Sequence, residues 1–440
     1  MTNILLLIAD DHRYCDSGAY GQTQIQTPHL DRLAREGLRA NRHSTPAPIC
    51  APARMAMYSG LHPVRNGGYP NHSYSYPKVR SITKHLQELG YRTGLHGKTH
   101  IAPRKVYAFE KVDEIEGFMQ RDPEQPFFLA IAYTEPHTPW GRHDHPAPSP
   151  ESLSLPPHLL DTPRTREGYA AYLSDVEVLD QKIGGVLDAL ERSGQADRTV
   201  VIYTGDHGAQ FPGGKWTCYE EGLRVPMIVR WPGVIEPGRV TDAMSQHVDL
   251  APTFVEIAGG DPGAIDCGMP TASGETGFCG KSLVPLWKGA TDQHSEYTYG
   301  VNTQNRTIGG CVYPIRSVAG QRYKLILNLN HTQTYSCAIT EPVGRNQHGN
   351  GYVPEWKQLV DEGDPRAQFL YYRFLHRPAV ELYDLENDPN EMKNLAEDPS
   401  LRQVREDLER KLAEWMEEQG DHGMATELET LKHQGLAWTD

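Results

Sequence analysis

One cysteine lies in a sequence context that could support catalysis. The segment Cys50-Ala51-Pro52-Ala53-Arg54 carries a proline that suits a first helical position, so we expect Cys50 just before a helix N-terminus. Unpaired backbone N–H groups at that end favour an anion, and Arg54, one turn along, can reach back towards the same point. A lone cysteine is more often a buried structural residue, so this prediction depends on the rest of the chain.

Two pairs of candidate metal ligands follow two predicted strands. Asp10-Asp11 come after the strand at Asn3 to Ala9, and Asp206-His207 come after the strand at Thr199 to Gly205. Ligands of open α/β sheets bind beyond the carboxyl ends of the strands, which predicts that both pairs face one crevice. Carboxylates suit a hard cation such as calcium or magnesium, whereas imidazole is a softer ligand. Either pair alone could cap a helix or lie solvated in a loop; together they favour a shared cation.

Three basic side chains are candidates for holding an anionic substrate. Lys98 and His100 lie two residues apart and so share one face of an extended stretch, and His137 follows the strand at Phe127 to Tyr133. The formal net charge of −14 would repel an anion, so basic residues must line the site if the substrate is anionic. A hydrogen-bonded structural imidazole is the alternative for any histidine among 20. The histidines without an assigned role include His62, His72 and His96.

The elements that must position these residues alternate between strand and helix up to about residue 300, the pattern of a sheet covered on both faces. Further strands are predicted at Thr93 to Gly97 and Met227 to Arg230. The predicted helices lie at Pro28 to Glu36, Arg54 to Gly60, Ile82 to Leu89, Arg166 to Arg192 and His247 to Ala258. We therefore predict an α/β catalytic domain over residues 1–304.

The texture changes after residue 304. Short strands are predicted at Tyr313 to Val318, Tyr323 to Leu329 and Glu381 to Leu385, with a Gly-, Asn- and Pro-rich stretch at 341–365 between them. A long amphipathic helix is predicted from Pro399 to Gly420, since its apolar residues recur with a helical period. We predict a smaller C-terminal α+β domain over residues 305–440.

Composition excludes some classes of protein. An acidic chain of 440 residues argues against a nucleic-acid-binding protein, and the apolar run Ile4 to Ala9 is too short to span a membrane. Seven cysteines are an odd number, and Cys267 and Cys279 are close enough in sequence for a loop disulfide, which stays open beside free thiols. The compartment is undecided: periplasmic or secreted if a signal peptide has been removed, otherwise cytoplasmic.

The pentapeptide at Cys50 resembles the modification signature Cys-x-Pro-x-Arg of the formylglycine-dependent sulfatases. Further blocks resemble this family in its order and over nearly the whole chain. They are Asp10-Asp11, Thr27-Pro28-His29-Leu30-Asp31, Leu61-His62-Pro63, Gly97-Lys98-Thr99-His100, Glu135-Pro136-His137, Thr204-Gly205-Asp206-His207-Gly208 and Glu381-Leu382-Tyr383-Asp384.

The resemblance implies a fold and a nucleophile. The fold is an alkaline-phosphatase-like mixed sheet flanked by helices. Cys50 is oxidised to formylglycine by a formylglycine-generating enzyme or an anaerobic sulfatase-maturating enzyme, and the hydrated aldehyde is a gem-diol nucleophile. The substrate is a sulfated saccharide.

The resemblance also implies roles for individual residues. Calcium is the expected cation, with magnesium or manganese as alternatives, and its ligands are Asp10, Asp11, Cys50, Asp206 and His207. Lys98 and Arg54 contact the sulfate, and Lys215 contacts the sulfate or the leaving group. His100 is the base that acts on the formylglycine. His137 binds sulfate, and either His137 or Lys215 protonates the leaving group.

Several stretches resemble the heparan N-sulfatase (sulfamidase) branch of this family. They are Asp16-Ser17-Gly18-Ala19-Tyr20, Phe211-Pro212-Gly213-Gly214-Lys215, Pro314-Ile315-Arg316-Ser317-Val318, Lys324-Leu325-Ile326-Leu327-Asn328-Leu329-Asn330 and Phe369-Leu370-Tyr371-Tyr372-Arg373. That branch implies N-sulfoglucosamine as substrate and a homodimer formed through the smaller domain, while oligomeric state and exo or endo action stay open.

This chain departs from the branch at two positions, since His207 stands where the branch has Asn and Lys215 where it has Arg. An O-sulfatase acting on an algal or host polysaccharide is therefore an alternative, as is a phosphonate or phosphate ester hydrolase of the same fold. A non-catalytic carbohydrate-binding protein would be expected to have lost some of these residues.

Overall fold

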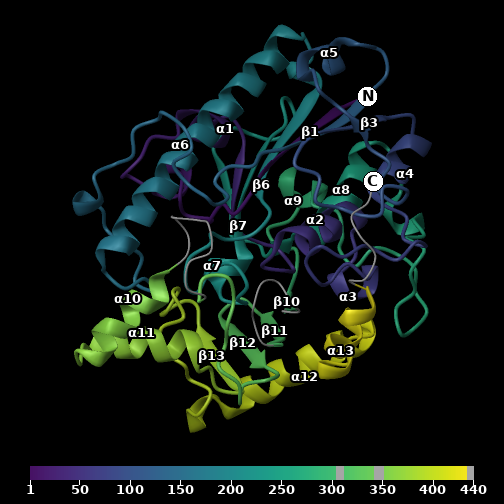
Figure 1. Cartoon of the computed structure of the whole chain (residues 1–440). Coiled ribbons are helices and arrows are strands. Elements are labelled where there is room, and N and C mark those ends of the chain that lie inside the picture. The colour runs from purple at the N-terminus through teal and green to yellow at the C-terminus, as the bar shows by residue number, and fades with distance from the viewer. Residues whose placement is uncertain (304–311, 341–350, 434–440) are drawn as a thin grey trace.

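A mixed β-sheet forms the centre of the larger part of the molecule (Figure 1). The computed structural model describes residues 1–303, 312–340 and 351–433. Within those ranges the sheet has nine strands, in the order β4-β3-β5-β1-β6-β7-β2-β8, with β9 also paired to β2. The strands are β1 Asn3–Ala9, β2 Leu38–Ser44, β3 Arg92–Gly97, β4 Glu110–Lys111, β5 Phe127–Ala132, β6 Thr199–Gly205, β7 Arg224–Arg230, β8 Arg239–Thr241 and β9 Ser245–Gln246.

The strands that matter most for the site are parallel neighbours. β1 pairs in parallel with both β5 and β6, and β5 pairs in parallel with β3. β7 runs antiparallel to β6 and β2, so the sheet is mixed. Because parallel strands end at the same edge, the residues that follow β1, β3, β5 and β6 are brought to one side of the molecule.

Helices cover both faces of this sheet, as the continuous apolar run of β1 requires. Ile4, Leu6 and Ile8 pack in one core with residues of α2 Cys50–Ser59, α4 Ile82–Glu88 and α8 Leu250–Ile257. Leu5 and Leu7 pack in a second core with α1 Pro28–Arg35, α5 Ile115–Gln120 and α6 Pro163–Arg192. The alternation of side chains along the strand therefore divides β1 between two helical layers.

A smaller antiparallel sheet lies beside the main one (Figure 1). Its order is β10 Thr298–Asn302, β11 Ile315–Ala319, β12 Tyr323–Asn328 and β13 Val380–Asp384. α12 Arg402–Gln419 covers this sheet with Leu408, Leu412 and Trp415. β10 precedes residue 305, so the smaller sheet begins before the predicted boundary. That boundary stays a prediction, since residues 304–311 lie outside the described ranges.

The remaining elements are short or lie at the edges. They are α3 Pro63–Asn66, α7 Glu220–Leu223, α9 Val284–Trp287, α10 Tyr352–Asp361, α11 Pro365–Leu375 and α13 Met424–His433, with 3₁₀ turns at Gly18–Tyr20, Pro150–Ser152, Ala196–Arg198, His247–Asp249, Pro262–Ala264 and Pro399–Leu401. Among the helices described, none combines the length and apolar character that a membrane crossing needs.

The sequence-based prediction of strands and helices differs from the structure at several places, three of which have a clear physical reason. β2 was not predicted, because its sequence Leu-Arg-Ala-Asn-Arg-His-Ser is polar and lacks a continuous apolar run. No helix was predicted in the Gly-, Asn- and Pro-rich stretch at 341–365, but its described part contains α10. α6 begins at Pro163 rather than Arg166, because Pro163 occupies the first turn and the Thr162 side chain accepts a hydrogen bond from the Thr165 amide.

Cys267 and Cys279 are free thiols, so the disulfide alternative is wrong. Cys267 is fully buried in the core beside the main sheet. The Sγ of Cys279 instead lies 3.3 Å from Nη1 of Arg65 and 3.3 Å from Oε1 of Gln419. Polar partners from two other segments thus occupy the surroundings of the second thiol.

Candidate active site

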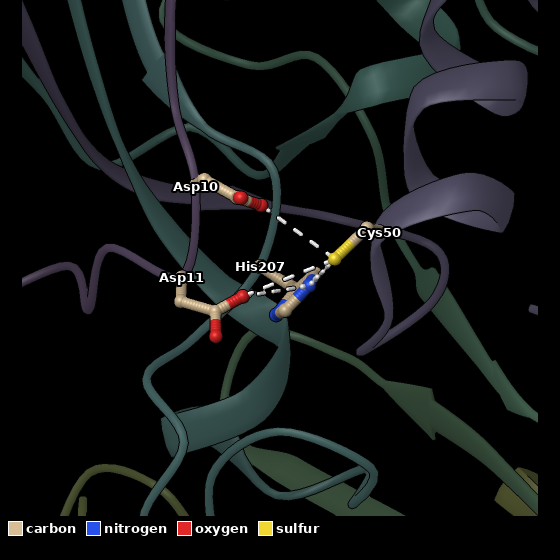
Figure 2. Close-up of side chains that lie close together, drawn as sticks. All are labelled: Asp10, Asp11, Cys50 and His207. Carbon is tan, nitrogen blue, oxygen red and sulfur yellow. Dashed lines mark hydrogen bonds and ion pairs between the residues drawn. The ribbon is translucent and has the colours of Figure 1, made fainter. Parts of the chain in front are cut away.

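Four side chains from three segments meet beyond the carboxyl end of the main sheet (Figure 2). Asp10 and Asp11 follow β1, His207 follows β6, and Cys50 lies at the start of α2. The four side chains point towards one another, and each offers one ligand atom within 4.8 Å of the others. All four are buried. Across the described residues, no second group of three or more His, Cys, Asp or Glu side chains meets this spacing.

Cys50 is the first residue of α2, and Ile49 is the residue that precedes the helix. The expectation that Cys50 lies just before the helix was therefore wrong by one residue, because Pro52 occupies the first turn without being its first residue. The Sγ of Cys50 is 3.2 Å from Nε2 of His207, 3.5 Å from Oδ1 of Asp10 and 3.5 Å from Nζ of Lys98. Position 50 thus contacts both the acidic group and a cation.

The charges around Cys50 favour an anion at that position. Burial opposes ionisation of the thiol, but Lys215, Lys98 and His207 outweigh it and hold the pKa of Cys50 well below its usual range. This is the electrostatic setting that a nucleophile bearing negative charge needs.

His207 is oriented as a metal ligand would be. Its Nδ1 lies 2.9 Å from the carbonyl oxygen of Gly208, and a carbonyl only accepts, so Nδ1 carries the proton and Nε2 faces the site. A hydrogen bond from the second ring nitrogen to a carbonyl is the usual support of a metal-binding histidine. Burial lowers the pKa of His207, but Asp206, Cys50 and Asp11 outweigh it and raise the pKa to about 9.

Asp206 lies beside the four-residue group and ties its segments together. Its Oδ1 accepts hydrogen bonds from the backbone amides of Asp11 at 3.0 Å and His207 at 2.9 Å. Its Oδ2 accepts from Nε of Arg54 at 2.9 Å. Asp206 is not among the residues whose ligand atoms cluster within 4.8 Å, so its predicted place as a metal ligand stays a prediction.

Arg54 is fully buried and links the two acidic segments. Besides Asp206, its Nη2 lies 3.4 Å from Oδ1 of Asp10. Burial disfavours its charge, but Asp206 and Asp10 raise the pKa of Arg54 further above its ordinary value. The guanidinium is therefore a fixed positive charge one turn into α2, where the sequence placed it.

Two lysines bring positive charge to the carboxylates. Nζ of Lys215 lies 2.9 and 2.8 Å from the two carboxylate oxygens of Asp11. Lys98, which follows β3, pairs with Asp10. Burial opposes both charges, yet Asp11 raises the pKa of Lys215, and Cys50 and Asp10 raise the pKa of Lys98. Both lysines are thus held in their charged form.

His137 presents Nε2 to the site. Its Nδ1 lies 2.6 Å from the carbonyl oxygen of Thr138 and so donates to it, while Nε2 lies 3.9 Å from Oδ2 of Asp11. Lys215 and burial lower the pKa of His137, but Asp11, Cys50 and Asp10 outweigh them and raise it. The charged form carries an Nε2 proton that faces the carboxylates.

His100 reaches the site in a different way from the one expected. The prediction that Lys98 and His100 lie on one extended stretch was wrong, because β3 ends at Gly97 and His100 has a φ of 44°. The ring nevertheless hydrogen-bonds the Cys50 side chain and thereby helps lower the pKa of that thiol. Its Nε2 also lies 3.1 Å from Nδ1 of His72. Sequence reasoning assigned no role to His72, and no spacing signal marks it, because it comes from a loop 28 residues earlier.

Two family profiles match the sequence of this chain. The sequence profile described as Sulfatase matches residues 2–113 and 109–260, and the profile described as N-sulphoglucosamine sulphohydrolase, C-terminal, matches residues 205–339. Together they span the main sheet, strands β10 to β12 of the smaller sheet and every candidate site residue named above.

Two relatives are similar to this chain over most of their length. An ulvan-active sulfatase of Formosa agariphila is 31% identical, with 95% of this chain and 80% of that protein aligned. Human N-sulphoglucosamine sulphohydrolase is 30% identical, with 95% and 90% aligned. The solved structure of BT4656 in complex with its substrate D-glucosamine-2-N,6-O-disulfate has a TM-score of 0.69 at 20% identity, covering 96% of this chain and 98% of that one.

Proposed function

Since this chain belongs to the sulfatase family, whose members are hydrolases, we propose that it removes sulfate from a sulfated saccharide with a formylglycine made from Cys50. The observation that carries the proposal is the position of Cys50 at the start of α2, within 3.5 Å of Lys98, Asp10 and His207. The modification requires a maturating enzyme, either the formylglycine-generating or the anaerobic type.

The acidic group fits a divalent cation. Asp10 and Asp11 offer hard oxygen ligands and His207 offers Nε2, and the Gly208 carbonyl holds the His207 ring in the orientation that ligation needs. We propose calcium, with magnesium and manganese as alternatives and Asp206 as a further ligand. Such a cation, when bound, would withdraw electron density from the nucleophile and from the sulfuryl oxygens.

The residues of the chain divide the remaining work. Lys98, Lys215 and Arg54 hold the sulfuryl group and stabilise the charge that develops on its oxygens during transfer. His137 protonates the departing oxygen or nitrogen through Nε2. One hydroxyl of the hydrated aldehyde would take the sulfuryl group as the bond from sulfur to the saccharide breaks. His100 would then remove the proton of the other hydroxyl, so that the bond between carbon and the sulfate oxygen breaks, the aldehyde re-forms and sulfate leaves. An ordinary serine or cysteine would remain as a stable covalent adduct, which is why an aldehyde is useful here.

We propose N-sulfated glucosamine as the substrate class. Support comes from the human relative named N-sulphoglucosamine sulphohydrolase and from the profile of its C-terminal region, which matches residues 205–339. An O-sulfated algal or host polysaccharide is the second candidate, since another relative is named for activity on ulvan. A homodimer formed through the smaller domain accompanies the first proposal.

The test is sulfate release from defined saccharides by the chain co-produced with a maturating enzyme. We expect turnover of glucosamine N-sulfate to exceed that of glucosamine 6-O-sulfate by at least about tenfold in kcat/KM, the equivalent of roughly 1.4 kcal/mol. The reverse order would favour the O-sulfatase. Paired aryl sulfate and aryl phosphate or phosphonate esters form a control, and a preference for the phosphorus esters would overturn the proposal.

A further inference from the structure

A second histidine contacts His100 from a different loop. Nδ1 of His72 lies 3.1 Å from Nε2 of His100, and the two ring centroids are 4.8 Å apart with the planes tilted by 52°. Two fully protonated imidazoles offer no lone pair to each other, so a hydrogen bond between them requires one ring to be neutral. One nitrogen then donates and the other accepts. The contact therefore couples the two rings, because Nε2 of His100 carries a proton only when Nδ1 of His72 does not, and the reverse.

Both residues have an unusual backbone conformation. His72 has a φ of 57° and His100 a φ of 44°, values in the left-handed region that side-chain-bearing residues rarely adopt. Such conformations persist only where the surroundings hold them. The loop of His72 is held at two points, because Oδ1 of Asn71 accepts from the Ala51 amide at 3.3 Å and the Ser75 amide donates to the Ala102 carbonyl at 2.8 Å.

These two tethers connect the pair to the nucleophile. Asn71, the neighbour of His72, binds the residue after Cys50, and Ser75 binds the segment that follows His100. His72 itself is exposed, whereas His100 is half-buried and touches Cys50. His72 thus lies at the rim of the site and contacts the His100 ring from the solvent side.

We infer that His72 is a positioning residue for His100: the bond between their rings fixes the tautomer and the orientation in which His100 faces position 50. The inference rests on the proposed function, in which His100 removes a proton from the hydrated aldehyde. His72 itself is not required to touch the substrate. A hydrogen-bonding group that orients a functional histidine typically contributes about 10- to 100-fold to activity.

Three substitutions separate this role from others. His72→Ala removes the ring, His72→Asn places an amide near the position of Nδ1, and His72→Gln places the amide one bond farther out. We expect His72→Ala to lower kcat by about 10- to 100-fold with KM changed by less than about twofold. His72→Asn should recover most of the lost kcat, and His72→Gln should not. His331→Ala, at another exposed histidine, is the matched control and should match the wild type.

Other kinetic outcomes would overturn the inference. A rise in KM at constant kcat would mean that His72 binds the saccharide directly. Wild-type kinetics for His72→Ala, or equal recovery by the Asn and Gln variants, would mean that the hydrogen bond has no part in turnover.

A readout that needs no turnover makes the result independent of the proposed function. Long-range ¹H–¹⁵N spectra of the imidazoles, with His100 assigned from a His100→Gln sample, report its tautomer. We expect one tautomer in the wild type and in His72→Asn, and a mixture or the other tautomer in His72→Ala. An unchanged tautomer in His72→Ala refutes the positioning role. If the tautomer of His100 changes as expected in His72→Ala but the chain hydrolyses neither sulfate esters nor sulfamates, the proposed function is refuted and the positioning role stands.

Discussion

Acidic and basic side chains alternate around Cys50, and this explains how a chain of net charge −14 can hold an anion. Asp10 is paired with Lys98 and Arg54, and Asp11 is paired with Lys215. Each cation is kept charged by a carboxylate that also faces the predicted metal position. A divalent cation bound to the carboxylates would leave the lysines free to contact sulfuryl oxygens. The same lysine–carboxylate pairs therefore suit both cation binding and sulfate binding.

Removal of the Cys50 side chain should abolish turnover and keep the fold. In Cys50→Ala the nucleophile precursor is lost, so we expect kcat to fall by at least about 10⁴-fold. The side chain removed is small and makes no ladder or cap contact, so the melting temperature should stay within about 3 °C of the wild type. Parallel kinetics and calorimetry check both expectations; near-wild-type hydrolysis would remove Cys50 from the mechanism.

Loss of the His100 ring should slow the release of sulfate rather than its transfer to the enzyme. In His100→Ala the first turnover gives a burst of desulfated product, and later turnovers slow by about 10²- to 10⁴-fold, the usual contribution of a general base. Stopped-flow product release together with intact-protein mass spectrometry would reveal an enzyme that carries one sulfuryl group. Steady multiple turnover without a burst would contradict the assigned role.

At the scale of single elements, the sequence predicts where a strand lies better than it predicts which other strands pair with it. The apolar run of β1 and the polar residues that follow it identify the strand and its functional end. The adjacency of β5, β1 and β6 is not visible from one chain, because it depends on pairings between residues as distant as Asn3 and Thr199. The left-handed φ of His100 is not visible from the sequence either, because only tertiary contacts hold that conformation.

The buried histidine that precedes α3, His62, makes the free energy of unfolding depend on pH. His62 immediately precedes α3, and its ring meets the Trp415 ring of α12 edge-on at 5.0 Å. Burial, with a smaller contribution from Arg65, lowers the pKa of His62 to about 3, against about 6.5 for an unfolded histidine. Below pH 6.5 the unfolded state therefore binds the extra proton, and stability is lost as the pH falls towards 3.

This predicts a defined difference between two proteins. Each pH unit below 6.5 should cost the wild type about 1.4 kcal/mol through His62, and His62→Gln should lack that part of the slope. Urea unfolding at pH 7.5, 5.5 and 4.5 measures the free energy of unfolding, with His331→Gln as the exposed control. Equal slopes for wild type and His62→Gln would show that the ring is not kept neutral by burial.

At the scale of the whole molecule, a buried ion pair holds the smaller sheet to the C-terminal helices. Arg316 of β11 pairs with Asp421, which follows α12, with Nη2 to Oδ1 at 3.1 Å, and neither side chain is exposed to solvent. Both lie far along the sequence from the residues near Cys50. The sequence predicted β11 and α12 but could not predict this pairing, because 105 residues separate its members.

Breaking this pair should destabilise the molecule without altering its chemistry. Arg316→Met leaves Asp421 buried and uncompensated, which typically costs about 3–5 kcal/mol. Arg316→Met combined with Asp421→Asn should cost clearly less, because no lone charge remains buried. Calorimetry and the kinetics of the surviving folded protein check this; a Met variant as stable as the wild type would contradict it.

The central claim is that turnover requires the oxidised form of Cys50. Graded co-expression with a maturating enzyme gives samples with different aldehyde fractions at position 50, which peptide mass spectrometry quantifies. The account predicts that kcat per chain rises in proportion to that fraction and extrapolates to zero when no aldehyde is present. Equal turnover by samples whose position 50 is still a thiol would contradict it.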